Sequence, residues 1–338
     1  MNADYTMMNP ADYKFLERFL DPTKANLFFA KGLIMVEGDA ENLLIPAIAE
    51  MMGKSLHKYG VSIVNVGSSA YKRYVNIFKR KDGKTFDMPI ALVSDLDERA
   101  LEYYDDNSKD RKIPEYWLKD PIFNELKAIT EEVNHDAMAR VYCSKTAFEN
   151  EVRANKTKNF AHIGVTIDCL KAVLTDNKTK LDEAMLSTIR EEQTKRRESE
   201  INKGKTKIFL PKDWTLEYEI AGSGLYRLLA LSIKSAYTEK NNPEYKLTDE
   251  RLLELWSKVK EKYPDDHKPS REDSYKIFAP LNDGTVSKAI TAQYLAGMIT
   301  GQLPPTKGND DLKEKVQGII ENDKRMEYIK KAIEHVTV

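Results

Sequence analysis

The chain has 338 residues, of which 41% are hydrophobic and 32% are charged. This apolar content supports a packed core and excludes global disorder, and the length suits one large domain or two modest ones. The 53 basic and 54 acidic residues give a formal net charge of −1, which excludes a uniformly basic protein that coats nucleic acid. A local basic surface remains compatible with that sum.

Cysteine usage and hydropathy indicate a protein of the reducing cytoplasm. The two cysteines, Cys143 and Cys169, stand far apart and fit neither a disulfide framework nor a cysteine zinc site. No apolar run approaches the roughly 18 residues that a membrane-spanning helix needs. Residues 1–12 also lack the basic and then apolar pattern of a signal peptide. We therefore expect a cytoplasmic protein with no membrane partner.

Helical and strand patterns alternate along the first hundred residues. A helical spacing of apolar residues extends to residue 31, and short apolar runs at 33–36, 61–66 and 88–93 predict buried strands. Helices are predicted between the strands, and Asp39 is expected to cap the first of these. This alternation predicts an α/β fold, with a parallel sheet flanked by helices. Ligands of such sheets bind at the carboxyl ends of the strands.

The rest of the chain is predicted to be mostly helical. Residues 99–205 are highly charged and contain one short strand candidate at 140–142, and a further strand is expected at 207–210. The residues after 223 are predominantly helical. The predicted division is a helical lead-in (1–31), a sheet core (32–98 and 206–222), a mostly helical insertion (99–205) and a helical C-terminal region (223–338).

Acidic residues follow two of the predicted strands. Glu37 closes the first strand, Glu41 lies one helical turn later, and Asp95 and Asp97 close the third strand. Residues two apart in an extended segment face the same side, so all four carboxylates can converge at one edge of the sheet. Such a cluster needs a compensating cation, and oxygen ligands favour magnesium, manganese or calcium over zinc. Each motif by itself also occurs by chance in loops; their joint placement favours a metal site.

These motifs and their flanks resemble the Toprim region of the OLD (overcoming lysogenization defect) family of nucleases. VEGDAE at 36–41 and DLD at 95–97 are typical of the Toprim domain, which occurs in topoisomerases, primases and certain nucleases. Four further passages are similar to the OLD family: RFLDPTKANLFFAKG at 18–32, WTLEY at 214–218, SKAITAQYLA at 287–296 and YIKKAI at 328–333. The resemblance implies a Toprim core and a metal-dependent DNA nuclease.

The resemblance also implies a role for each acidic residue. Glu37 and Glu41 match the first acidic pair and would help to hold one metal ion. Asp95 would bridge two ions, and Asp97 would serve the second. Glu217 matches the later acidic ligand, although it would be a plain surface glutamate if it lay in an exposed loop between a strand and a helix. The cofactors implied are divalent ions, Mg²⁺, Mn²⁺ or Ca²⁺, and two of them.

Lys288 matches the lysine that the family places near the scissile phosphate. An exposed lysine at a helix start is the alternative interpretation of this residue. Glu219 could replace Glu217, and Lys307 could replace Lys288, because both lie in similar local sequence. The implied catalytic residues are Lys288, Asp95 and Glu37.

The implied reaction is nicking or cleavage of DNA by a two-metal mechanism, which needs no histidine or cysteine. Two alternatives are a primase- or topoisomerase-like Toprim transfer enzyme and a catalytically silent interaction module with a vestigial acidic cluster. The lack of a cysteine-rich zinc segment speaks against a primase, and the intact set of five carboxylates speaks against a silent module. Two basic stretches, 72–84 and 195–207, are candidate DNA contacts or simply solvated surface.

One departure from the family concerns the ABC-type ATPase that ordinarily precedes its Toprim region. Gly53, Lys54 and Ser55 resemble the end of a phosphate loop, but Ile48 stands where its first glycine is required. We therefore expect no ATP binding. The chain is interpreted as a nuclease region, either a part of a longer protein or one shortened in nature. Homodimerisation would then depend on the region that is missing.

Overall fold

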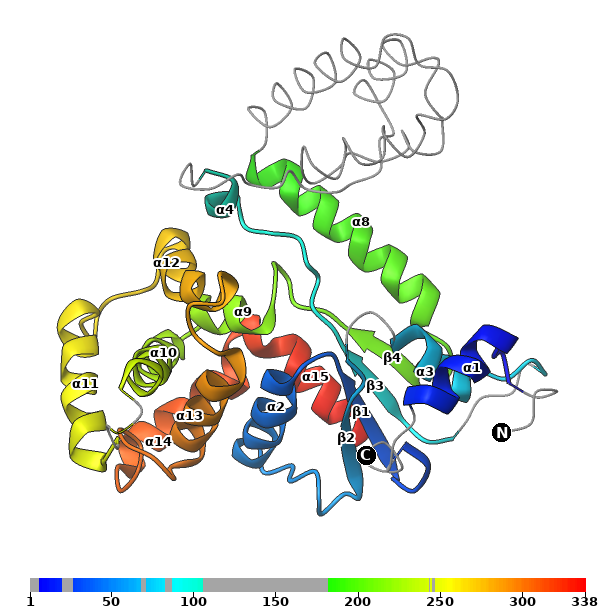
Figure 1. Cartoon of the computed structure of the whole chain (residues 1–338), viewed down its shortest axis with the longest axis horizontal. Coiled ribbons are helices and arrows are strands. Elements are labelled where there is room, and N and C mark those ends of the chain that lie inside the picture. Colours follow the sequence, from blue (N-terminus) through cyan, green and yellow to red (C-terminus); the bar gives the residue numbers. More distant parts are fainter. Residues whose placement is uncertain are drawn as a thin grey trace, which may run out of the picture. The chain divides into compact units, whose positions relative to one another are not determined.

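The computed structural model describes residues 6–19, 27–67, 71–82, 87–105, 182–242, 244 and 247–338. The chain divides into two compact units, Met1–Asp97 with Gln193–Val338, and Glu98–Glu192. The first unit contains the sheet (Figure 1). By its residue bounds it also contains every candidate site residue. Both cysteines, the strand candidate at 140–142, residues 20–26 of the family passage and most of the predicted insertion lie outside the described residues.

A parallel sheet of four strands forms the centre of the first unit. The strands are β1 (Gly32–Val36), β2 (Val61–Asn65), β3 (Ile90–Val93) and β4 (Thr206–Phe209), in the order β2-β1-β3-β4. Every pairing is parallel, with Ile34 opposite Ile63 and Ala91. All residues of β1 and β3 are buried, as expected for central strands covered on both faces. The sheet and its helices confirm the predicted α/β fold class.

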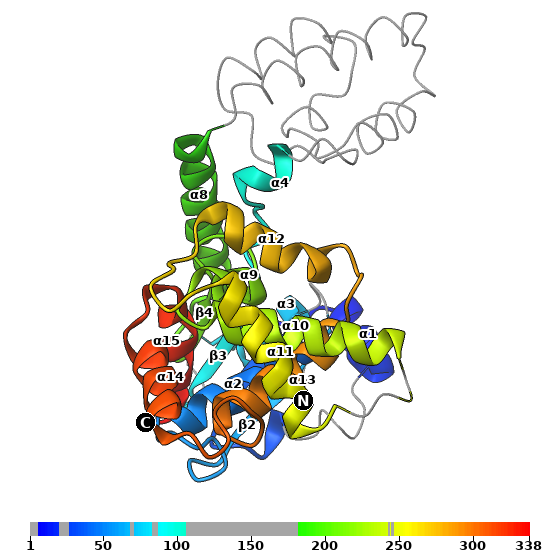
Figure 2. The ribbon, with the colours of Figure 1, turned by 90° about the vertical axis from the view of Figure 1, so that its left-hand side faces the viewer.

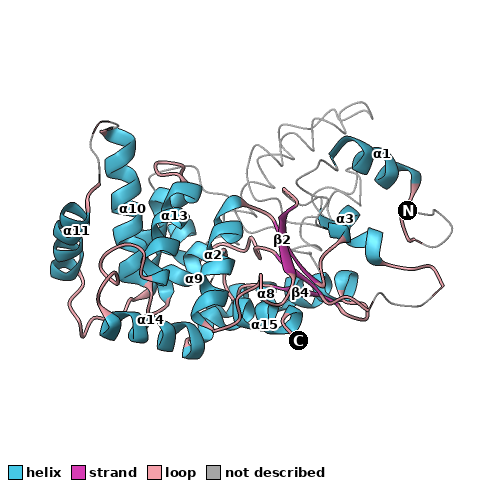
Figure 3. Ribbon diagram, turned by 90° about the horizontal axis from the view of Figure 1, so that it is seen from below, coloured by secondary structure: helices cyan, strands magenta, loops and turns pink. Residues whose placement is uncertain are grey.

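Helices cover both faces of the sheet. On one face, α1 (Pro10–Phe19) and α3 (Tyr71–Phe78) enclose an apolar core that includes Leu33 and Met35 of β1. On the other face, α15 (Glu327–Val336) packs against β1, β3 and β4 and also contacts α2 (Asp39–Met51). Figure 3 shows α1 and α3 on one side of the strands and α2 on the other. The last helix of the chain is therefore part of the sheet's own core.

The C-terminal region is helical, as predicted. Its elements are α9 (Leu216–Gly222), α10 (Tyr226–Asn241), α11 (Asp249–Lys262), α12 (Arg271–Asn282), α13 (Lys288–Thr300), α14 (Asp310–Asn322), the short 3₁₀ helix η5 (Lys324–Met326) and α15. Helix α13 packs extensively along α2 and also against α10 (Figure 2). Because α2 begins just after β1, this packing brings residues from the end of the chain to the carboxyl edge of the sheet.

The structure corrects two local predictions. The helix predicted to extend to residue 31 is described from Pro10 to Phe19, and residues 27–31 form a short 3₁₀ turn and a loop in place of a helix. Asp39 does not cap α2: Gly38 holds the cap position without a side-chain hydrogen bond. The Asp39 carboxylate instead accepts a hydrogen bond of 2.8 Å from the side chain of Asn65, because the end of β2 lies beside it.

The remaining helices are α4 (Leu101–Asp105) and α8 (Glu183–Ile201), which begin in the second unit. Helix α8 continues into the first unit and supplies residues to the carboxyl edge of the sheet. None of the helices in the described part of the chain is long and apolar enough to cross a membrane.

The packing of α15 against the sheet predicts that a methyl group added at Gly32 destabilises the fold. A Cβ added at Gly32 would lie 2.8 Å from the carbonyl oxygen of Val336 and 3.2 Å from a methyl group of Val61. Gly32→Ala should therefore lower the free energy of unfolding by about 1–3 kcal/mol, as overpacking does elsewhere. Urea unfolding followed by circular dichroism would measure this loss.

The matched control is Gly318→Ala in α14, where nothing lies within 4 Å of an added Cβ. Replacing glycine by alanine in an open helical position stabilises by about 0.5–1 kcal/mol. Equal behaviour of the two variants would contradict the packing of α15 against the first strand.

Candidate metal centre at the carboxyl edge of the sheet

Two polar side chains follow neighbouring strands at the carboxyl edge of the sheet. Glu37 comes directly after β1 and Ser94 directly after β3, and the Ser94 hydroxyl donates a hydrogen bond to Oε1 of Glu37. Burial raises the pKa of Glu37 and the charge of Asp97 adds to the rise, while the Ser94 hydrogen bond and the charge of Arg197 oppose it. Glu37 is thus held in place by its neighbour across the sheet.

Asp95 joins the end of β3 to the start of α9. Its Oδ1 accepts a hydrogen bond of 3.1 Å from the backbone N–H of Leu216, the first residue of that helix. The backbone N–H groups of Leu96 and Asp97 both donate to the carbonyl oxygen of Trp214, at 3.0 and 3.3 Å. These bonds fix the two segments to each other, so α9 begins at the acidic edge of the sheet.

Glu41, Glu217 and Lys288 approach the same edge from three helices. Glu41 is 7% exposed and Glu217 is 3% exposed. The Nζ of Lys288 lies 3.1 Å from Oε2 of Glu217, and the same oxygen accepts a hydrogen bond of 2.9 Å from the hydroxyl of Thr215. The other oxygen of Glu217, Oε1, is buried and has no hydrogen-bond partner among the residues described. A buried carboxylate oxygen without a partner can accept one more ligand.

The pKa shifts show that these groups interact strongly. Burial, followed by the charges of Glu217 and Glu41, raises the pKa of Asp95 well above its ordinary range. Burial and the charge of Glu217 raise the pKa of Glu41 to about 7. Burial alone would lower the pKa of Lys288, but the charges of Glu217, Asp95 and Glu41 outweigh it and the pKa is raised. The carboxylates therefore carry more negative charge than Lys288 balances.

Asp97 lies at the rim of this cluster. Its side chain is 70% exposed, and its backbone has φ +65°, a left-handed conformation that is uncommon outside glycine. Oδ2 of Asp97 lies 3.6 Å from Nη2 of Arg197, which comes from α8. Arg197 also donates to the carbonyl oxygens of Asp95 and Leu96 and to the hydroxyl of Ser94. It thereby holds the strained loop after β3 in one shape.

Arg197, Ser94 and Thr215 were not singled out by the sequence. Ser94 offers a local signal, since it is the first residue after a strand and precedes the acidic pair. Arg197 lies inside the predicted basic stretch 195–207, but no spacing distinguishes it from its neighbours. Its role depends on the path of α8, which local sequence does not reveal.

The two replacement residues lie elsewhere. Glu219 is fully buried and pairs with Arg325 at 2.8 Å, while its other oxygen accepts a hydrogen bond of 2.6 Å from the backbone N–H of Asp213. Burial and the charge of Asp213 raise the pKa of Glu219 to about 6, against the pull of Arg325. Lys307 is exposed and pairs with Asp249 at 2.6 Å. The structure thus brings Glu217 and Lys288, and not Glu219 and Lys307, to the acidic edge.

The donor set suits a hard divalent cation. The oxygens of Glu37, Glu41, Asp95, Asp97 and Glu217 are the ligand type that Mg²⁺, Mn²⁺ and Ca²⁺ prefer, and one of them is a buried oxygen without a partner. In the conformation described, no three acidic, histidine or cysteine side chains of the described residues converge closely enough to form a metal cage. A bound ion would therefore have to draw these side chains inward.

Many of the basic residues proposed to contact DNA pair with protein groups. Lys72 pairs with Glu200 at 2.5 Å, and Lys79 donates to the carbonyl oxygen of Glu200 at 2.6 Å. Lys205 pairs with Asp87 at 2.6 Å. Residues 83–84 lie outside the described residues. The described lysines of the two stretches thus contribute partly to joining α3, β4 and the adjacent loops.

The parallel sheet places acidic residues after two adjacent strands, β1 and β3, as the Toprim-like motifs in the sequence predicted. Residues 28–97 match the family model described as "Overcoming lysogenization defect protein-like, TOPRIM domain". This stretch contains β1, β2 and β3 together with Glu37, Glu41, Asp95 and Asp97. The chain therefore carries a Toprim domain of the OLD type, which confirms the resemblance in its sequence.

Solved structures of OLD proteins also cover most of the chain. The C-terminal region of the Burkholderia pseudomallei OLD protein is 19% identical, with 92% of this chain and 98% of that chain covered and a TM-score of 0.37. The C-terminal region of the Xanthomonas campestris pv. campestris OLD protein, phased with platinum, is 18% identical, with 93% and 95% covered and a TM-score of 0.36. No curated protein matches the sequence.

The raised pKa of Glu41 predicts a dependence of stability on pH. This pKa is about 7 in the folded protein and 4.5 in the unfolded chain, so the folded state retains a proton that the unfolded state releases between these pH values. Without divalent ions, the folded state should thus lose up to about 3 kcal/mol through Glu41 as the pH rises from 4.5 to 7. Urea unfolding in a chelator, at several pH values, measures this loss.

Glu41→Gln is the control, because it keeps the size of the side chain and cannot ionise. As the pH rises from 4.5 to 7, the free energy of unfolding of Glu41→Gln should increase relative to that of the wild type, because only the wild type loses stability through residue 41. Mg²⁺ should reduce the difference, since a cation at the cluster relieves the same repulsion. A difference between the two proteins that stays constant with pH would contradict a strained, buried Glu41.

Proposed function

We propose that the protein is a metal-dependent endonuclease that cleaves phosphodiester bonds of DNA. One observation carries the proposal: three buried or half-buried carboxylates, Glu41, Asp95 and Glu217, interact electrostatically with one another and with Lys288 at the carboxyl edge of a Toprim sheet. Such a cluster does not stabilise the fold, because buried groups of like charge repel one another. It suits a protein that binds divalent cations and holds a phosphate against them.

The proposed ligands divide between two neighbouring positions. Glu37 and Glu41 would hold one ion, Asp95 would lie between the ions, and Asp97 would serve the second, with Glu217 as the later acidic ligand. Two divalent ions can activate a water molecule and stabilise the leaving oxygen of a phosphodiester. The buried partnerless oxygen of Glu217 and the raised pKa of Asp95 support this assignment, since both conditions are relieved by a bound cation.

Lys288 is proposed to stabilise the charge that develops on the phosphate. Lys288 is the first residue of α13, and the side chain of Ser287 caps this helix. Lys288 reaches the cluster with 41% of its side chain still exposed. The ammonium group thus contacts Glu217 and lies 5.9 Å from the centre of the Phe278 ring. A positive charge fixed in that position favours the more negative transition state over the ground state.

The supporting residues keep this arrangement rigid. Arg197 holds the loop after β3, Ser94 holds Glu37, and Thr215 holds Glu217. None of the three needs to touch the reacting phosphate for this purpose. We expect the protein to act on DNA in the cytoplasm, with Mg²⁺, Mn²⁺ or Ca²⁺ as the ions tested first.

Cleavage of supercoiled plasmid tests the proposed function directly. The protein with Mg²⁺ or Mn²⁺ should convert supercoiled DNA to nicked or linear forms, and a chelator should stop the reaction. Asp95→Ala should abolish the activity, because it removes the carboxylate proposed to lie between both ions. Gel electrophoresis of the products measures each outcome.

Circular dichroism of Asp95→Ala should confirm that the fold is retained. Glu219→Gln is not a suitable control, since it breaks the buried pair with Arg325. Cleavage by Asp95→Ala at the wild-type rate would exclude the two-metal assignment.

A second prediction separates Lys288 from the lysine that the sequence left as a replacement. Lys288→Ala should lower the cleavage rate by about 10²-fold, the usual loss for one preorganised electrostatic contact. Binding of Mn²⁺, measured by isothermal titration, should persist because the carboxylates remain. Lys307→Ala should cleave at the wild-type rate, since Lys307 pairs with Asp249 on the surface. The reverse pattern would assign the catalytic role to Lys307.

A further inference from the structure

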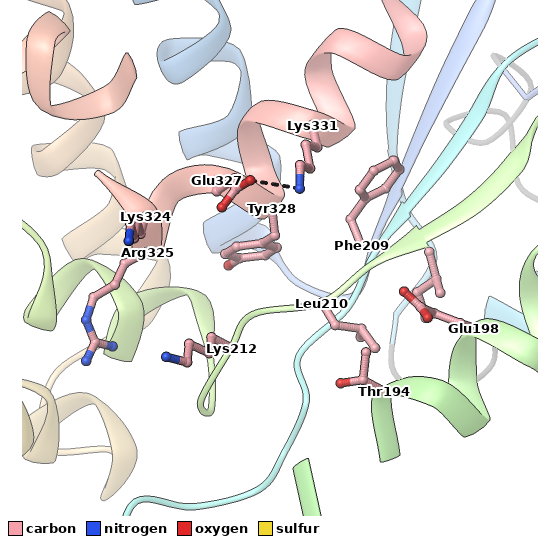
Figure 4. A pocket seen from close by; sticks show the side chains of 11 residues that line it. Thr194, Glu198, Phe209, Leu210, Lys212, Lys324, Arg325, Glu327, Tyr328 and Lys331 are labelled. Carbon is pink, nitrogen blue, oxygen red and sulfur yellow. Dashed lines mark ion pairs between the residues drawn. The ribbon is translucent and has the colours of Figure 1, made fainter. Parts of the chain in front are cut away.

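Tyr328 lines a pocket of about 460 Å³ (Figure 4). The charges of Asp95 and Glu41 act on the hydroxyl of the same residue, which links the pocket to the acidic cluster. The end of β4, the loop that follows it, η5, the first turns of α15 and the C-terminal half of α8 form its walls. This volume falls within the range of sites that hold one small organic molecule. None of the residues assigned to the proposed metal centre lines it.

The lining of the pocket is positively charged. Four cationic side chains, Lys212, Lys324, Arg325 and Lys331, face two carboxylates, Glu198 and Glu327. Lys331 pairs with Glu327 at 2.8 Å, and Arg325 pairs with Asp213 and Glu219 outside the lining.

Lys212 and Lys324 differ from the other two cations. Both are exposed, and neither forms an ion pair with any residue in the described part of the chain. Figure 4 shows their ammonium groups on the same side of the pocket as the guanidinium of Arg325. The pocket therefore contains two cationic side chains that no described residue neutralises by an ion pair. Its charge is thus opposite in sign to that of the acidic cluster.

Tyr328 connects the pocket with the acidic cluster. Its ring lines the pocket, whereas its hydroxyl oxygen is buried and has no hydrogen-bond partner among the residues described. Burial, followed by the charges of Asp95, Glu219 and Glu41, raises the pKa of this hydroxyl well above its ordinary range. The same aromatic side chain thus lines the pocket and has a buried hydroxyl on which the charges of two proposed metal ligands, Asp95 and Glu41, act.

We propose that this pocket receives an unpaired nucleotide of the DNA strand that flanks the scissile phosphate. Lys212 and Lys324 would bind its phosphate, and the ring of Tyr328 would contact its base or sugar. Positive charge combined with an aromatic surface is the arrangement by which proteins hold single strands without regard to sequence. The inference rests on the proposed nuclease function, because that function places the strand at the adjacent cluster. It adds a substrate class: DNA with an unpaired segment at the cleavage site.

Binding of labelled oligonucleotides tests the pocket apart from catalysis. Fluorescence anisotropy would compare a single strand with a duplex of equal length, with Mg²⁺ present and in the cleavage-deficient Asp95→Ala background. The double variant Lys212→Ala/Lys324→Ala should weaken binding of the single strand by about tenfold. It should also reduce the slope of log affinity against log salt by about 0.7 for each phosphate that the variant no longer neutralises. Binding of the duplex should change by less than about threefold.

Two controls separate the pocket from general charge. Lys58→Ala/Lys258→Ala removes two exposed lysines outside the pocket and should leave single-strand affinity unchanged. Tyr328→Phe keeps the ring and should bind as the parent does, whereas Tyr328→Leu should bind the single strand several-fold more weakly. Thermal unfolding of the tyrosine variants would show that each remains folded.

The outcomes distinguish this inference from the proposed function. The pocket variant could bind the single strand as tightly as its parent while the wild type still cleaves plasmid. That result would reject the nucleotide-binding role of the pocket and leave the proposed nuclease function intact. Equal losses for single strand and duplex would also overturn the pocket, because they indicate a general backbone contact. If the wild type cleaves no DNA and the pocket variant still binds the single strand more weakly than its parent, the nuclease function is wrong and the pocket stands as a site for single-stranded DNA without a link to cleavage.

Discussion

The structure depends on carboxylates that are held together against their mutual repulsion. Parallel strands end at the same edge of a sheet, so Glu37 and the segment after β3 meet there whatever their charge. Buried carboxylates without sufficient counter-charge retain protons, and the raised pKa of Glu41 and of Asp95 reflects that cost. Hydrogen bonds from Ser94, Thr215 and the backbone of Leu216 hold three of these side chains, those of Glu37, Glu217 and Asp95, in spite of this cost.

The helices around the sheet can be understood from this constraint. Helix α9 directs the N–H of Leu216 at Asp95, α13 packs along α2 to bring Lys288 against Glu217, and α8 lays Arg197 over the loop after β3. Each contact places a donor or a positive charge beside a carboxylate. Together they do not neutralise the cluster, and the remaining negative charge is the basis of the cation binding proposed above.

The sequence predicted the sheet and the four acidic residues nearest to it, because both follow from local patterns. Short apolar runs define the strands, and Glu37 and Asp95 come directly after them. Arg197 could not be predicted, since it approaches from a helix more than a hundred residues after β1. The sequence assigned the later acidic ligand to Glu217 and left Glu219 as its possible replacement. Only tertiary contacts separate them: one faces Lys288, and the other is enclosed with Arg325.

The wide separation of the contributing segments has a consequence for how such a protein can be divided or recombined. The stretch that matches the family, residues 28–97, supplies four carboxylates but neither the lysine nor the arginine that accompany them. It also lacks β4 and α15, which complete the sheet and one of its faces. The stretch that matches the family is thus smaller than the set of segments that build the candidate site: an exchange of residues 28–97 alone would transfer the acidic motifs without Lys288 or Arg197.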